Sequence, residues 1–147
     1  MRTVLLASIA VGAMMLQANA QTTAKPAVGS DEIAWVITFH VQPDQLADFK
    51  KVVAPLVAAT KEEPGALDYE YYVGADQSTV DILERYRDSN AVVAHVTQTF
   101  GPKFSKAFLA LAKPTRFVVY GAPSAEAQKI LAGFHPVYMS PFDGFTR

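Results

Sequence analysis

Three side chains that could take part in proton transfer lie close together in the middle of the chain: Glu84, Tyr86 and His95. Glu84 and Tyr86 belong to a run over residues 79–87 whose alternating pattern predicts a strand, and residues two apart on a strand share one face. His95 follows on a segment where Asp88-Ser89-Asn90 predicts the start of a helix. An imidazole exchanges protons near neutral pH, so the stretch predicts an acid–base site.

Each of these residues also has a purely structural explanation, which the sequence leaves open. His95 could serve only to hydrogen-bond Glu84 or a backbone group. Glu84 could form an ion pair with Arg116 from the last predicted strand, because such networks also hold folds together. Tyr86 could pack in the core with its hydroxyl hydrogen-bonded.

Four further residues are candidate substrate contacts: His40, Tyr71, Phe104 and Arg116. His40 is equally consistent with a dimer interface. The three histidines, at positions 40, 95 and 135, lack the paired spacing of metal ligands, and no glycine-rich phosphate loop is present. We therefore expect neither a metal ion nor a nucleotide cofactor.

The elements that must position these residues are four strands and two helices. Strands are predicted at residues 33–41, 66–73, 79–87 and 115–121 from their period of two. The first helix runs from Gln42 to about Thr60 with Pro55 inside it, and the second is expected to break at Gly101-Pro102 into two segments at an angle. The order strand, helix, strand, strand, helix, strand predicts an α+β, ferredoxin-like fold with a four-stranded antiparallel sheet and helices on one face.

Four segments are expected along the chain. Residues 1–20 read as a secretory signal peptide, with Arg2 before an apolar run and a small-residue cleavage pattern at Ala18-Asn19-Ala20. Residues 21–31 read as a linker, 32–122 as the folded domain, and 123–147 as a short helix and an aromatic tail that packs on its own domain or on a partner subunit. The expected location is secreted or periplasmic, with no membrane anchor after cleavage.

Composition narrows the possible partners. The chain has 147 residues, enough for one domain with a core, and no cysteine, so the fold depends on packing rather than on disulfides. Its formal net charge is −1, and it contains no basic cluster. Nucleic acids and anionic membranes are therefore not expected as partners.

The first predicted strand, residues 33–41, indicates a homodimer. Trp35, Ile37 and Phe39 point to one face, while Val36, Thr38 and His40 point to the other, so both faces are largely apolar. Two helices can cover only one face of a four-stranded sheet. We expect a second copy of the chain to cover the other face.

The order of these features resembles the antibiotic biosynthesis monooxygenase (ABM) family. The consensus of that family runs through a Gly, a Tyr-containing strand, a Glu-x-Trp pair and a helix bearing a His. The matching residues here are Glu63-Pro64-Gly65, Tyr69-Glu70, Glu84-x-Tyr86, Asp88 and His95, within a resemblance from Ile33 to about Gly121. Two features depart from it: Tyr86 replaces the Trp, and no second His occurs at Phe100-Gly101-Pro102.

The resemblance implies a dimeric α/β barrel and, in some members, oxidation of quinols or polyphenols by O₂ without a cofactor. On this basis the chain is expected to be a monooxygenase of a small aromatic or quinol-like substrate. His95 would act as the base, Glu84 would orient it, and the Tyr86 hydroxyl would bind the substrate or a peroxy intermediate. Two alternatives remain: a non-catalytic dimeric module that binds a small hydrophobic ligand, and a scaffold whose pocket is filled by its own side chains.

Overall fold

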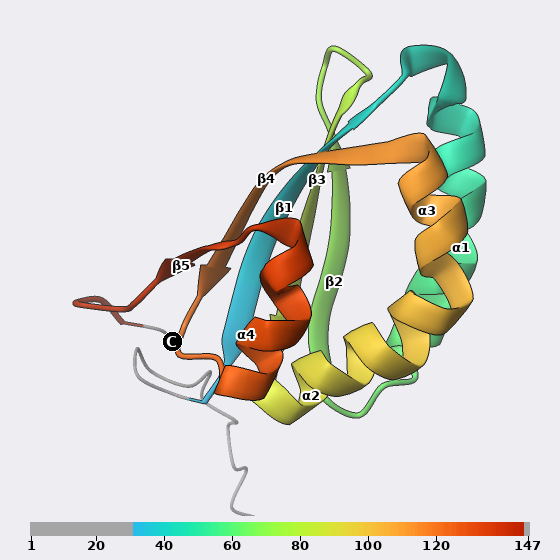
Figure 1. Cartoon of the computed structure of the whole chain (residues 1–147). Coiled ribbons are helices and arrows are strands. Elements are labelled where there is room, and N and C mark those ends of the chain that lie inside the picture. Colours follow the sequence, from blue (N-terminus) through green and yellow to red (C-terminus); the bar gives the residue numbers. More distant parts are fainter. Residues whose placement is uncertain (1–30, 146–147) are drawn as a thin grey trace, which may run out of the picture.

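The computed structural model describes residues 31–145, which form one sheet covered by helices on one face (Figure 1). The sheet has the order β2-β3-β1-β4-β5. Its strands are β1 (Ile33–Val41), β2 (Ala66–Val73), β3 (Thr79–Tyr86), β4 (Ala112–Tyr120) and β5 (Val137–Met139). The expected signal peptide and nearly all of the expected linker lie outside the described residues.

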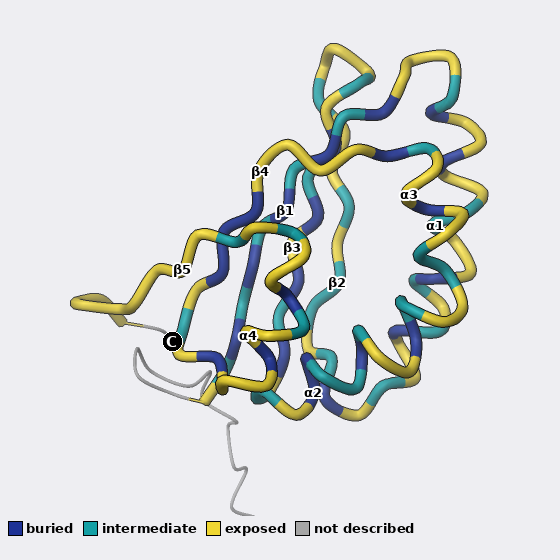
Figure 2. Tube along the Cα trace, in the orientation of Figure 1, coloured by how far each residue is buried: buried dark blue, intermediate teal, exposed yellow. Residues whose placement is uncertain are grey.

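The centre of the sheet is β1, which pairs antiparallel with β3 on one side and with β4 on the other. Every second residue of β1, from Ile33 to Val41, is buried, and the residues between them are half-buried. On β3 the buried positions are Val80, Ile82, Glu84 and Tyr86. The strand alternation therefore places Glu84 and Tyr86 on the inner, buried face of the sheet. Figure 2 shows buried positions recurring along β1 and β3.

The helices follow the chain as η1 (Pro43–Gln45), α1 (Leu46–Lys61), α2 (Ser89–Ala94), η2 (His95–Phe104), α3 (Ser105–Leu111), α4 (Ala125–Leu131) and η3 (Ala132–Phe134). Their buried apolar residues join the same core as the inner face of the sheet. Pro55 lies inside α1 without ending it, as expected. Among residues 31–145, no helix is long and apolar enough to cross a membrane.

The second predicted helix changes its geometry instead of breaking. Between α2 and α3 the chain continues as η2, a π-helix that contains Pro102, and Figure 1 shows α2 and α3 running in different directions. The wider π turn brings the Val96 carbonyl against Gly101, where a Cβ atom would collide with it. A helix of this kind often marks a functional region, and His95 is its first residue.

The four-stranded antiparallel part of the fold prediction describes β2-β3-β1-β4 correctly, but the sheet has a fifth strand and is mixed. β5 pairs parallel with β4, because α4 carries the chain back along the sheet before β5 begins. Three residues are too few to show a strand period in the sequence. The tail through β5 therefore packs on its own domain.

Candidate functional site

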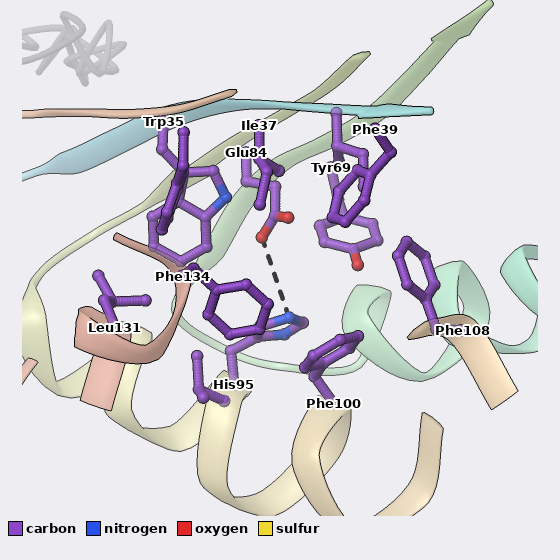
Figure 3. Close-up of a pocket in the computed structure, with 13 residues that line it drawn as sticks. Trp35, Ile37, Phe39, Tyr69, Glu84, His95, Phe100, Phe108, Leu131 and Phe134 are labelled. Atoms are coloured by element: carbon purple, nitrogen blue, oxygen red, sulfur yellow. Dashed lines mark ion pairs between the residues drawn. The ribbon is translucent and has the colours of Figure 1, made fainter. Parts of the chain in front are cut away.

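A cavity lies between the inner face of the sheet and the helices, with a free volume of about 50 Å³ (Figure 3). Most of its wall is apolar, and only three of its lining residues are polar: Tyr69, Glu84 and His95. Its aromatic walls come from β1, β4, η2, α3 and η3 through Trp35, Phe39, Phe100, Phe108, Phe117 and Phe134. The polar groups therefore face one another in a nearly dry environment, where electrostatic interactions are strong.

His95 reaches the cavity because the helix that leads to it has a fixed start. The Asp88 carboxylate accepts a hydrogen bond from the Ala91 backbone N–H at 2.9 Å, which caps α2. His95 follows at the end of that helix and is only 3% exposed. Its ring lies 5.3 Å from the Tyr86 ring and 5.5 Å from the Tyr69 ring, measured between centroids.

Glu63 contacts the His95 ring at Nδ1, the ring nitrogen that does not approach Glu84. His95 Nδ1 lies 3.1 Å from Glu63 Oε1 and 3.2 Å from Oε2, and an ionised carboxylate can only accept hydrogen bonds. Nδ1 therefore donates to Glu63, which leaves Nε2 as the lone-pair nitrogen of the neutral ring. Nε2 lies 3.9 Å from Glu84 Oε2, beyond hydrogen-bonding distance.

Glu84 is a buried carboxyl whose pKa is raised above its usual value. Burial is the main cause, and it outweighs the opposing effects of His95, Tyr86 and Trp35, which favour the ionised form. The Tyr86 hydroxyl donates a hydrogen bond to Glu84 Oε2 at 2.6 Å. Burial, followed by the charge of Glu84, also raises the pKa of Tyr86 well above the ordinary value of a phenol, so Tyr86 acts as a hydrogen-bond donor and not as an acid.

Tyr69 completes the polar part of the wall. It lies directly across from Glu84 in the pairing of β2 with β3, and its hydroxyl is 3.0 Å from that of Tyr71. Burial raises its pKa most, with Glu84 adding to the effect. The phenol therefore keeps its proton and offers a neutral hydrogen-bonding group at the edge of the cavity.

The arrangement places a base and an acid side by side in an apolar cavity. His95, held in one orientation by Glu63, presents Nε2 as a proton acceptor, while burial favours the protonated form of Glu84. Two titratable groups with different environments are the usual basis of acid and base roles in one site. The described residues contain no group of three or more His, Cys, Asp or Glu that could hold a metal ion.

The three predicted catalytic residues lie near one another, but Glu84 does not orient His95 as predicted: Glu63 holds the ring, and His95 Nε2 is 3.9 Å from Glu84. His95 and Glu84 line the cavity, and Tyr86 lies behind Glu84, to which it donates its hydrogen bond. Sequence reasoning did not include Glu63 or Tyr69 in the site. Both residues were named only among those that carry the resemblance to the family, and the position of Tyr69 opposite Glu84 depends on a strand register that the sequence does not give.

The four predicted substrate contacts do not line the cavity. Arg116 is exposed and pairs with Thr38 in the register of β1 and β4, because Phe117 takes the inward position; the Glu84–Arg116 ion pair is therefore not formed. His40 faces the same outer side, next to Thr79 and Lys113. Tyr71 reaches the site only through Tyr69 and lines a separate pocket of about 90 Å³. Phe104 packs against the core at the end of η2.

Comparison with known proteins gives a consistent result. Residues 33–108 match the family described as antibiotic biosynthesis monooxygenase. Among solved structures, MupZ from Pseudomonas fluorescens is similar with a TM-score of 0.70 and 26% identity, over 80% of this chain and 91% of MupZ. Rv0793 from Mycobacterium tuberculosis is similar with a TM-score of 0.55 and 25% identity, over 65% of this chain and 98% of the Rv0793 chain.

SnoaB, a cofactor-independent oxygenase from Streptomyces nogalater, is similar with a TM-score of 0.55 and 21% identity, over 65% of this chain and 97% of SnoaB. At this identity the likeness shows a shared fold. A comparison with curated protein sequences found no match.

Proposed function

Because the chain belongs to the antibiotic biosynthesis monooxygenase family, we propose that it oxidises a small aromatic or quinol-like substrate with O₂ and without a cofactor. The name of the family and the presence of a cofactor-independent oxygenase among the similar structures support a monooxygenase role. The substrate class is our inference from the cavity, whose walls are aromatic and whose few polar groups could bind a phenolic hydroxyl.

The observation that carries this proposal is the position of His95 between two carboxyl groups. Glu63 fixes the ring through Nδ1, and Nε2 is directed to the side of Glu84 in the cavity (Figure 3). A base in a water-poor, aromatic-lined space is what activation of a phenol requires, since the phenolate is the form that donates an electron to O₂.

The reaction balances without an added reductant. His95 Nε2 takes the phenolic proton, the phenolate transfers an electron to O₂, and a C–O bond forms at a ring carbon that carries hydrogen. The O–O bond of the resulting hydroperoxide then breaks, which leaves one oxygen on the carbon as a carbonyl. The other oxygen leaves as water: one of its protons comes from the imidazolium, and the second comes from Glu84, which regains a proton when the ring carbon loses its own. The substrate supplies all four electrons that O₂ accepts, and both His95 and Glu84 return to their starting protonation states.

The test is oxygen uptake under controlled addition of O₂. The purified protein is incubated anaerobically with a panel of phenols and hydroquinones, and ¹⁸O₂ is then admitted. We expect one O₂ consumed per substrate and one ¹⁸O atom in the product. Replacing a general base typically costs about 10²–10⁴-fold in rate, so His95→Ala should reduce uptake to that extent, while His135→Ala, in the exposed tail, should not.

Uptake that equals the no-protein control for every compound would refute the oxygenase proposal for that panel. Saturable binding of the same compounds, without uptake, would instead support the module that binds a small hydrophobic ligand. The apolar cavity fits that function as well, because binding does not need the acid–base pair.

We also propose that the chain forms a homodimer through the sheet face opposite the helices. Members of the family bind small substrates and often form dimers. On this face Val36 is half-buried and lies across from Leu83, which is 37% exposed, and Tyr120 at the end of β4 is 42% exposed. A second copy would remove this apolar surface from water.

Export by a cleaved signal peptide remains a proposal from the sequence of residues 1–20. Its test is N-terminal sequencing of the protein recovered from outside the cytoplasm. A mature chain that begins near Gln21 is the expected result, and an intact Met1 on the exported protein would contradict cleavage.

A further inference from the structure

The cavity is too small for an aromatic substrate. Its free volume of about 50 Å³ suffices for a few water molecules. A cavity that admits benzene is roughly 150 Å³ in size. One of the side chains in the wall must therefore move before a ring can reach His95 and Glu84.

The wall is not equally fixed on all sides. Most lining residues are buried, such as Trp35 on β1 and Phe117 on β4. Four residues of the wall are only partly buried: Tyr69, Val96, Phe100 and Phe134. These four mark the sides from which a ligand could enter.

Three of the four are held by regular structure. Tyr69 belongs to β2, where its backbone pairs with β3 and its hydroxyl contacts Tyr71. Val96 and Phe100 belong to η2, which is packed against α1, α2 and α3. The backbone at each of these three residues is therefore held by a strand pair or by contacts with other helices.

Phe134 is held differently. It ends η3, a turn of three residues that packs chiefly on α4, and its ring contacts those of Phe100 and Phe117 with centroids 6.5 Å and 6.2 Å away. The next residue, His135, has a left-handed backbone conformation with φ of 51°, which residues other than glycine seldom adopt. The residue before Phe134, Gly133, has no atom within 4 Å of the position that a Cβ would take. Phe134 thus lies in a short turn, whereas the other three residues belong to a paired strand or to a longer helix.

Phe134 also belongs to a part of the chain that the family match does not include. We call residues 125–139, which form α4, η3 and β5, the closing segment. The family match ends at Phe108, before this segment. The buried Leu131 anchors the segment to the core, and Figure 3 shows the Phe134 ring pointing into the cavity from the end of it.

We propose that Phe134 determines the size of the aromatic ligand that the cavity admits, and that its ring must move aside for such a ligand to reach Glu84 and His95. The inference rests on the proposed function only in taking this cavity as the substrate site, and it requires no particular reaction. Because a phenyl ring is the group removed by truncation, Phe134→Ala should enlarge the site by about one aromatic ring.

The test uses Trp35, the single tryptophan of the chain, which lines the cavity. Its fluorescence is titrated with 1,4-naphthoquinone and with 1,4-anthraquinone, which differ by one fused ring. In Phe134→Ala we expect the ratio of the two dissociation constants to shift toward the larger quinone by about tenfold or more, the usual effect of fit in an apolar pocket. The matched control is Phe142→Ala in the same tail, where the side chain is 98% exposed, and it should leave the ratio unchanged.

A second readout needs no ligand. Quenching of Trp35 by acrylamide should increase in Phe134→Ala and remain unchanged in Phe142→Ala, because only the first substitution opens the cavity. If Phe134→Ala does not fold, Phe134→Leu should shift the ratio of the two dissociation constants in the same direction but by less. An unchanged quinone ratio and unchanged quenching in a folded Phe134 variant would overturn the proposal.

The outcome is separable from that of the oxygenase test. The quinone titration needs no O₂. A shifted ratio of dissociation constants without oxygen uptake would support the role of Phe134 and refute the oxygenase. Oxygen uptake with an unchanged ratio would support the oxygenase and refute the role of Phe134.

Discussion

Glu63 and His95 are 32 positions apart in the chain, yet His95 Nδ1 lies 3.1 Å from Glu63 Oε1. Glu63 follows the last turn of α1, and His95 begins η2, so the pair connects the two helical segments above the sheet. Both side chains are mostly withdrawn from water: Glu63 is 16% exposed and His95 is 3% exposed. The contact therefore fixes which nitrogen of His95 is left for chemistry.

The first prediction concerns the tautomer of His95. Nitrogen-15 NMR of the neutral ring should show the proton on Nδ1 in the native protein, because the Glu63 carboxylate can only accept. In Glu63→Ala the acceptor is lost, and the proton should move to Nε2, the form that the isolated imidazole prefers. The rate of any His95-dependent reaction should fall with it, by roughly 10²-fold or more.

The exposed His135 provides an internal reference in the same spectra. Its signals should not respond to the Glu63 substitution. A native His95 that carries its proton on Nε2 would contradict the assignment of Nε2 as the proton acceptor.

The second prediction follows from the raised pKa of Glu84. A carboxyl whose pKa is higher in the folded than in the unfolded state binds protons more tightly when folded, so its contribution to stability is complete below the unfolded value of 4.5 and is lost as the pH rises through the folded value. The stability of the native protein relative to Glu84→Gln should therefore decrease as the pH rises from about 4 to 8. Each unit of pKa difference contributes about 1.4 kcal/mol.

Urea unfolding of both proteins at each pH measures this difference. The exposed Glu62 gives the matched control, because Glu62→Gln should show no comparable trend. A difference between the native protein and Glu84→Gln that grows with pH would mean that the folded site favours the ionised carboxyl.

Much of the fold could be predicted because its signals are local. The period of two defines β1 as Ile33–Val41 and β2 as Ala66–Val73 with the same bounds in sequence and structure. β5 could not be found in this way, since Val137–Met139 is short and forms a strand only through pairing with β4. The π-helix was also missed, because a Gly-Pro pair indicates a disturbed helix without indicating how the chain adapts.

The site was predictable only as far as single elements determine it. Glu84 and Tyr86 share a face on one strand, and this relation is confirmed by their 2.6 Å hydrogen bond. Contacts between different elements could not be predicted from the sequence. One is the contact of Glu63, at the end of α1, with His95, and the other is the pairing of Tyr69 on β2 with Glu84 on β3. Arg116 was misplaced because Phe117, and not Arg116, takes the inward position on β4.

The third prediction concerns two glycines in the part of the fold that carries the site. A Cβ atom on Gly65 would collide with the side chain of Ala91 on α2, so Gly65→Ala should destabilise the protein by about 1–3 kcal/mol. Gly133 has open space around it, and Gly133→Ala should change stability by less than about 1 kcal/mol. Urea unfolding checks both. Equal effects would show that α2 does not pack closely on the turn after α1.

The fourth prediction tests the dimer with two leucines of almost equal exposure. Leu83 on the outer face of β3 is 37% exposed, and Leu109 on α3 is 38% exposed. If the outer face meets a second copy, Leu83→Glu buries an unpaired charge there and should raise the dimer dissociation constant by about tenfold or more. Leu109→Glu, on the helical side, should leave it unchanged. Sedimentation velocity at micromolar concentration measures both, and a native chain that sediments as a monomer would refute the dimer itself.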